Sequence, residues 1–129
     1  MRKFTPIVLM MCITLLLFSA CGKTSNPAVK AVEDYLAALV NKDANSLSAL
    51  SCADWESNAL LELDSLQAVA TRLENLACSA TGTDGTTTQV NCQGKIIATY
   101  NSEDQELDLS VRTYLVIQQG GEYLVCGYQ

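Results

Sequence analysis

Histidine is absent from this chain of 129 residues. Without an imidazole the chain cannot build a Ser-His-Asp or Cys-His catalytic arrangement, and it lacks the side chain that most often moves protons near neutral pH. Acid–base work by two carboxylates, as in glycosidases, stays open because 14 residues are Asp or Glu. We therefore take a non-catalytic role as the leading hypothesis and a carboxylate-dependent enzyme as an alternative.

Basic residues are also scarce, with 8 Lys and Arg in total. Two of them, Arg2 and Lys3, stand at the very start, so the chain after Ala20 carries the other 6 against all 14 acidic residues, a formal charge of −8. Nucleic-acid binding depends on clustered Lys and Arg, and no such cluster occurs. The sequence therefore predicts no nucleic-acid partner.

The usual metal and cofactor motifs are missing as well. No two cysteines stand two to four residues apart, as structural zinc sites favour, and no EF-hand spacing or glycine-rich phosphate loop occurs. We expect no metal and no cofactor. One acidic cluster, Glu103, Asp104, Glu106 and Asp108, is interpreted as a solvated hairpin, with a weak calcium site as the alternative.

The N-terminal segment has the pattern of an export signal, because Arg2 and Lys3 precede an uncharged run from Ile7 to Ala20. At about 1.5 Å per residue this run spans about 21 Å as a helix, short of the roughly 30 Å of a bilayer's hydrocarbon core. The run ends in Leu17-Phe18-Ser19-Ala20-Cys21, which resembles the lipobox of bacterial lipoproteins.

That resemblance implies a sequence of processing steps. The sulfur of Cys21 receives a diacylglyceryl group, the signal peptide 1–20 is removed, and the new amino terminus is acylated. Palmitate is the acyl chain expected on Cys21. Acyl chains on Cys21 then hold the protein to a membrane on the extracytoplasmic side, with residues 21–26 as a tether. An ordinary secretory signal and an uncleaved anchor helix are the alternatives.

Four cysteines remain beyond Cys21: Cys52, Cys78, Cys92 and Cys126. In an exported protein an even set predicts two disulfides, which four thiols can form in three ways. The turn signal Thr83-Asp84-Gly85 lies between the middle two cysteines, so a hairpin pairing of Cys78 with Cys92 is preferred, leaving Cys52 for Cys126.

Residues 27–129 change pattern midway. Asn26-Pro27 starts a helix whose apolar stripe runs from Val29 to Val40; a short helix follows Asp43, and a third runs from about Ala53 to Ala70. Alternating strands follow around Leu76–Ala80, Val90–Tyr100, Leu107–Ile117 and Glu122–Tyr128, with a hairpin turn at Gly120-Gly121. Helices followed by about four antiparallel strands predict an α+β domain with helices on one face of the sheet.

The phrases "VEDYLAALVNKDANSLSAL", "DGTTTQVNCQGKI" and "GGEYLVCGY" resemble small NTF2-like (cystatin-like) bacterial lipoproteins of uncharacterised function. The resemblance implies a curved sheet wrapped around helices. It brings no catalytic residue, because the enzymes of that family commonly use a His–Asp arrangement. On the concave side Trp55, Tyr100 and Tyr114 are candidate pocket walls, although packing in the core explains the same residues.

We therefore expect a lipid-anchored, extracytoplasmic domain that binds or scaffolds. The alternatives are the carboxylate-dependent enzyme, with a pocket between sheet and helices, and a structural envelope module acting through a protein partner.

Overall fold

The structure is a computed structural model and describes residues 26–129. Three helices come first: α1 (Pro27–Val40), α2 (Ala44–Ala49) and α3 (Ala53–Ser65). The strands β1 (Ala70–Asp84), β2 (Thr87–Tyr100), β3 (Glu103–Asp108), β4 (Thr113–Gln119) and β5 (Glu122–Tyr128) follow, with the 3-10 turn η1 (Leu109–Val111) between β3 and β4. The α+β class predicted from the sequence is confirmed. The signal peptide, Cys21 and most of the expected tether lie outside the described residues.

Side-chain caps set the starts of α1 and α2. The Asn26 side chain accepts a hydrogen bond from the Ala28 amide at 3.0 Å, and Asp43 accepts one from the Ser46 amide at 3.1 Å. The expected extension of α3 to Ala70 is wrong. The chain turns after Ser65 through backbone hydrogen bonds within residues 63–69, and β1 begins at Ala70.

The sheet has five antiparallel strands rather than about four, in the order β1-β2-β4-β5, with β3 also paired to β2. The long strand β2 changes neighbours along its length: its first part pairs with β4 and its last part with β3. The single strand expected over residues 107–117 is therefore wrong, because η1 carries the chain from one stretch of β2 to the other.

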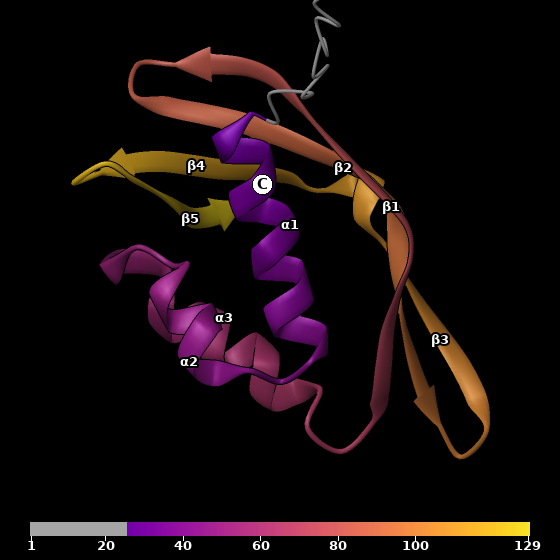
Figure 1. The fold of residues 1–129 in the computed structure, drawn as a ribbon. Helices are drawn as coiled ribbons and strands as arrows, with labels where there is room; N and C mark the ends of the chain where they lie inside the picture. The colour runs from indigo at the N-terminus through magenta and orange to yellow at the C-terminus, as the bar shows by residue number, and fades with distance from the viewer. Residues whose placement is uncertain (1–25) are drawn as a thin grey trace, which may run out of the picture.

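The hairpin of β1 and β2 curves around the helices (Figure 1). A β-bulge supports this bend, since the register shifts between Glu74 and Ala77, with Asn75 at a φ of 53°. Opposite the bulge, Gly94 has a φ of 102°, and a Cβ there would lie 2.5 Å from the backbone oxygen of Glu74. Only glycine fits this position, so the bend is fixed by the sequence.

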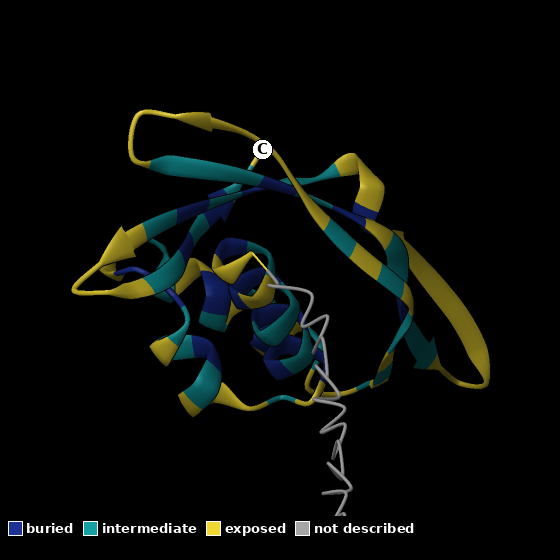
Figure 2. Cartoon of the chain, turned by 45° about the horizontal axis from the view of Figure 1, so that its top comes forward, coloured by how far each residue is buried: buried dark blue, intermediate teal, exposed yellow. Residues whose placement is uncertain are grey.

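Helix α1 fills the concave side of the sheet, as the dark blue core in Figure 2 shows. Its inner stripe of Val32, Tyr35, Leu36 and Leu39 is fully buried against the sheet. The start of β1 is fixed to the end of α1, because the Thr71 hydroxyl donates to the backbone oxygen of Val40 at 2.6 Å. Within residues 26–129 no helix is long and apolar enough to cross a membrane.

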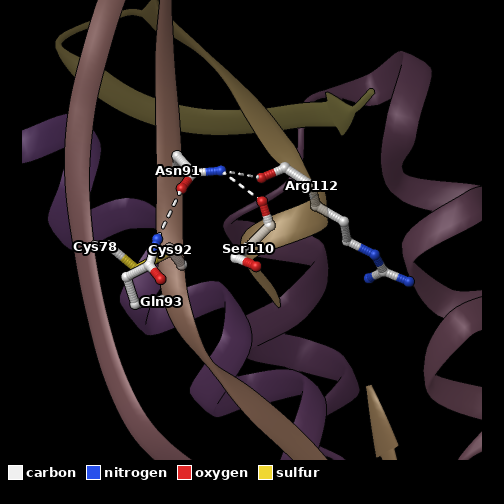
Figure 3. The surroundings of a disulfide bond; sticks show 6 residues. All are labelled: Cys78, Asn91, Cys92, Gln93, Ser110 and Arg112. Atoms are coloured by element: carbon white, nitrogen blue, oxygen red, sulfur yellow. Dashed lines mark hydrogen bonds between the residues drawn. A yellow bond between two sulfur atoms is a disulfide. The ribbon is translucent and has the colours of Figure 1, made fainter. Parts of the chain in front are cut away.

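Two disulfides join Cys52 to Cys126 and Cys78 to Cys92, the pairing preferred from the sequence. The second crosses directly opposed positions of β1 and β2 and packs against the core, with Cys92 fully buried. Beside it, the side-chain amide nitrogen of Asn91 donates to the backbone oxygens of Ser110 and Arg112 (Figure 3). These bonds hold η1 against β2, with the Arg112 side chain directed away from Asn91.

Candidate functional site

Aromatic side chains fill the concave interior near the C-terminal strand. The Trp55 indole donates to the Tyr35 hydroxyl at 3.0 Å and meets the Tyr128 ring edge-on, with 5.4 Å between centroids. The ring of Tyr114 lies 5.7 Å from that of Tyr128 and 6.3 Å from that of Tyr35. Edge-to-face contacts of this kind stabilise an interior beyond simple burial.

The position of the Trp55 indole depends on Gly127 in β5. Gly127 has a φ of 126°, and a Cβ there would lie 3.3 Å from the indole ring. The indole therefore packs directly on the backbone of β5, beside the disulfide that ties Cys52 to Cys126. Trp55 belongs to this packed interior.

An ion pair between α3 and the residue that follows η1 lies against the aromatic interior. A guanidinium nitrogen of Arg112 lies 2.7 Å from Oε1 of Glu62, with only 15% and 16% of the two side chains exposed. The guanidinium carbon also lies 4.0 Å from the centroid of the Tyr128 ring, a cation–π contact. Burial acts to lower the pKa of Arg112, but the hydrogen bond and charge of Glu62 outweigh it and raise the pKa.

Two buried oxygens beside this ion pair lack hydrogen-bond partners: Oε2 of Glu62 and the hydroxyl of Tyr114. Burial raises the pKa of Tyr114 to about 12, against the opposing effect of the Arg112 guanidinium. Burial likewise raises the pKa of Tyr35 above its ordinary value. Both phenols therefore stay protonated over the physiological range, and neither is set up as a base.

A cavity of about 220 Å³ opens where α3 faces β2 and β3. Leu66, Ile96, Ala98 and Leu107 provide an apolar lining, and Glu62, Arg112, Ser65, Gln105 and Glu106 provide the polar groups. An apolar lining with a few polar groups is typical of small-molecule sites, although this cavity is smaller than those that hold drug-sized ligands. The arrangement suits a small molecule with an apolar body and a polar end.

The three candidate pocket walls lie in different environments. Tyr114 is fully buried, and Trp55 is half-buried in the same aromatic interior, so both fill the concave side. Tyr100 is 60% exposed at the end of β2, beside the turn into β3. It therefore forms no wall of the interior, because the strand end carries it past the helices.

All four residues of the acidic cluster lie within the exposed strand β3, where the solvated hairpin was expected. Asp104 pairs with Arg72 at 3.1 Å, and Glu106 pairs with Lys95 at 2.7 Å. Asp108 instead accepts hydrogen bonds from the amide and hydroxyl of Ser110, which lower its pKa. Among residues 26–129, no three Asp, Glu or Cys side chains gather as a metal ion would require.

Sequence reasoning missed Glu62 and Arg112. No local signal was available for Arg112, because it stands at an even-numbered position of the alternating stretch 107–117, where an outward-facing polar residue is expected. The partner itself could not be found, since 50 residues separate it from Arg112. Glu62 looks like any polar residue on an amphipathic helix.

Two further grooves run along the outer side of α1. One, of about 450 Å³, lies between α1 and α2 and includes Ala37, Asn41 and Ser46. The other, of about 380 Å³, lies between the start of α1 and the β4–β5 turn and includes Pro27, Lys30 and Tyr123. They share Asp34, Ala49 and Leu50, so they form one continuous depression outside the core.

The chain matches no protein-family profile, and its sequence matches no curated protein. Similarity appears at the level of the fold. A Shewanella frigidimarina protein assigned as a ketosteroid isomerase superposes with a TM-score of 0.56 at 14% identity, over 81% of this chain and 94% of that one.

Two further solved structures give the same result. A Streptomyces avermitilis protein assigned as a dehydratase of the NTF2-like family has a TM-score of 0.55 at 15% identity, over 79% of this chain and 90% of that one. An NTF2-like protein with a cystatin-like fold from Novosphingobium aromaticivorans has a TM-score of 0.53 at 14% identity, over 79% and 77%. The NTF2-like fold expected from the sequence is confirmed, and identities this low carry no activity across.

Proposed function

We propose that this NTF2-like domain is tethered through acylated Cys21 to the extracytoplasmic side of a membrane, where it binds a small molecule. The lipobox-like end of the apolar run supports the anchor. Two disulfides support an oxidising compartment, since thiols in the cytoplasm are kept reduced. On this proposal, the N-terminal segment sets the location of the protein and the α+β body does the binding.

The cavity between α3 and the β2–β3 hairpin is the observation that carries the binding role. It combines an apolar lining with the paired charges of Glu62 and Arg112. A neutral ion pair attracts neither anions nor cations strongly, so we assign the site to an uncharged or weakly polar ligand. Its small volume favours a molecule smaller than a typical drug.

We also propose that binding proceeds without catalysis. An acid–base pair needs two carboxylates held together in a protected site. Glu62 and Glu106 both line the cavity, but Glu106 is 59% exposed and pairs with Lys95, while Glu62 pairs with Arg112. The unpartnered Oε2 of Glu62 is what favours the alternative, an enzyme with Glu62 as its working group.

The anchor is tested by expressing the protein in its host with labelled palmitate. We expect label in the wild-type protein and none in a Cys21→Ala variant, which should leave the membrane fraction. A matched change nearby, Ser25→Ala, should keep both label and location. An unlabelled wild type, together with a membrane-bound Cys21→Ala variant, would contradict the proposal.

The binding site is tested with a library of uncharged fragments, followed by NMR shifts of backbone amides. Bound fragments should shift residues that line the cavity, such as Ala98 and Leu107. An Ala98→Phe variant, which fills the cavity, should lose these shifts, while Ala80→Phe on the exposed part of β1 should keep them. Fragments that instead shift amides lining the grooves along α1, and that still do so in the Ala98→Phe variant, would contradict binding in this cavity.

A further inference from the structure

The tether joins the body at the start of α1. Asn26 caps this helix and Pro27 is its first residue. If Cys21 carries the acyl chains, as proposed above, five residue steps separate the lipid from Asn26. At about 3.5 Å per residue, a fully extended tether reaches about 17 Å.

The cavity lies at the opposite end of α1. This helix has 14 residues, and at about 1.5 Å each it is about 21 Å long. Its last residue, Val40, accepts a hydrogen bond from Thr71 near the start of β1, and Ala70 pairs with Thr99 near the end of β2. The β2–β3 turn and the cavity residue Ala98 therefore lie near the end of α1, and Figure 1 shows β3 at that end of the molecule.

From these lengths we infer that the bilayer surface faces the start of α1 and the neighbouring groove, while the cavity lies at the end of the body farther from the membrane. The groove includes Pro27, Lys30, Tyr123 and Leu124. Turning the cavity end against the lipid would place the start of α1 about 21 Å from the surface, beyond the tether's reach of about 17 Å. The ligand thus enters from the aqueous side.

Tether length, rather than electrostatic attraction, sets this orientation. In the groove facing the lipid, Lys30 pairs with Asp34 at 2.8 Å, and Glu122 adds a further negative charge. Binding to anionic lipid needs a cluster of Lys and Arg, which this face lacks among residues 26–129. The acidic body is held near the surface by its anchor and not by its own charge.

The test uses lipoprotein purified from its host membrane and placed in lipid nanodiscs that carry gadolinium on a fraction of the headgroups. Methyl NMR then reports the distance of each leucine from the lipid. Relaxation of Leu124, in the groove, should be several-fold stronger than that of Leu107, at the cavity. Equal relaxation of the two, or stronger relaxation of Leu107, would overturn the inference.

A lengthened tether provides the matched control. Inserting about twelve Gly and Ser residues between Ser25 and Asn26 raises the full reach to about 60 Å, so the body can turn freely. The difference between the two leucines should then largely disappear. A difference that persists would overturn tether length as its cause.

Failure of the anchor itself is separable from failure of the orientation. If the purified protein carries no acyl chains, its intact mass reveals this before any nanodisc is made. That result would overturn both the anchor and the orientation. Acylated protein with equal relaxation at Leu124 and Leu107 would overturn the orientation alone.

Discussion

Breaking the Glu62–Arg112 ion pair should destabilise the domain strongly, because each side chain would leave its partner as an unpaired, largely buried charge. Glu62→Gln removes the carboxylate and keeps the shape, while Arg112→Met removes the guanidinium and keeps the length. The change at Arg112 should lower the free energy of unfolding more than the change at Glu62. It deprives Glu62 of its hydrogen-bond donor when Oε2 already lacks one, and it also removes the cation–π contact with Tyr128.

The expected size follows from distance and burial. At the 2.7 Å separation, the Coulomb attraction is about 6 kcal/mol with an effective dielectric constant of about 20, before the cost of desolvation. Removing one partner of a buried pair typically costs about 3–5 kcal/mol. We expect about 3 kcal/mol for Glu62→Gln and about 4 kcal/mol for Arg112→Met. The double variant should lose about 2 kcal/mol less than the sum, because neither charge is then left alone.

Urea unfolding followed by tryptophan fluorescence measures these differences. The chain has 1 tryptophan, Trp55, which packs against Tyr128 and so reports on this part of the interior. The exposed pair of Lys30 and Asp34 provides a matched control, and its double-variant cycle should show a far smaller coupling. A coupling between Glu62 and Arg112 no larger than that control would refute the reasoning.

Four further outcomes are expected. Gly94→Ala should cost about 3 kcal/mol or more in urea unfolding, because the new Cβ meets the Glu74 backbone at a positive φ; a stability within about 0.5 kcal/mol of wild type would contradict the bulge. Gly127→Ala should displace Trp55 and shift its emission maximum, and an unchanged spectrum would count against that contact. Reduction should lower the free energy of unfolding by about 3 kcal/mol for the Cys78–Cys92 disulfide (sequence separation 14) and by about 4 kcal/mol for Cys52–Cys126 (separation 74). A denaturation midpoint that reduction leaves unchanged would mean that the thiols are free. The free energy of unfolding should fall as pH rises above about 10, because tyrosine in the unfolded chain loses its proton there, while folded Tyr114 keeps its proton up to a pKa of about 12. A Tyr114→Phe variant should show a weaker fall. An identical pH profile in that variant would exclude Tyr114 as the source.

Much of the fold was predictable because its signals are local. Asn26-Pro27 and Asp43 cap helices where the sequence placed their starts, and Gly120-Gly121 forms the expected turn with positive φ at both residues. The end of α3 was not predictable, because no glycine or proline marks the turn after Ser65. Apolar residues at Leu66 and Val69 continue the helical spacing beyond the point where the chain leaves the helix.

The break between β3 and β4 was missed for a different reason. Odd-numbered apolar residues alternate from Leu107 to Ile117, so the pattern looks like one strand. Across η1 the phase changes: Leu109 is buried, but further on Tyr114 and Val116 are the buried residues. A shift of one residue exchanges the faces of a strand, and alternation alone does not reveal where it happens.

The candidate site was less predictable than the fold. Aromatic residues could be assigned to the interior from their type, yet sequence did not separate the fully buried Tyr114 from the exposed Tyr100. That difference depends on where β2 passes beyond the helices. The Glu62–Arg112 contact depends on how α3 packs across the sheet, which local patterns do not encode.

The most direct test of the anchored binding domain is the intact mass of the protein purified from its host membrane, with and without reduction and alkylation. The account predicts residues 21–129 plus one diacylglyceryl group, with or without a third acyl chain on the amino terminus, less four hydrogens for two disulfides. A mass that retains residues 1–20, or lacks the acyl chains, would contradict the anchor and the orientation built on it.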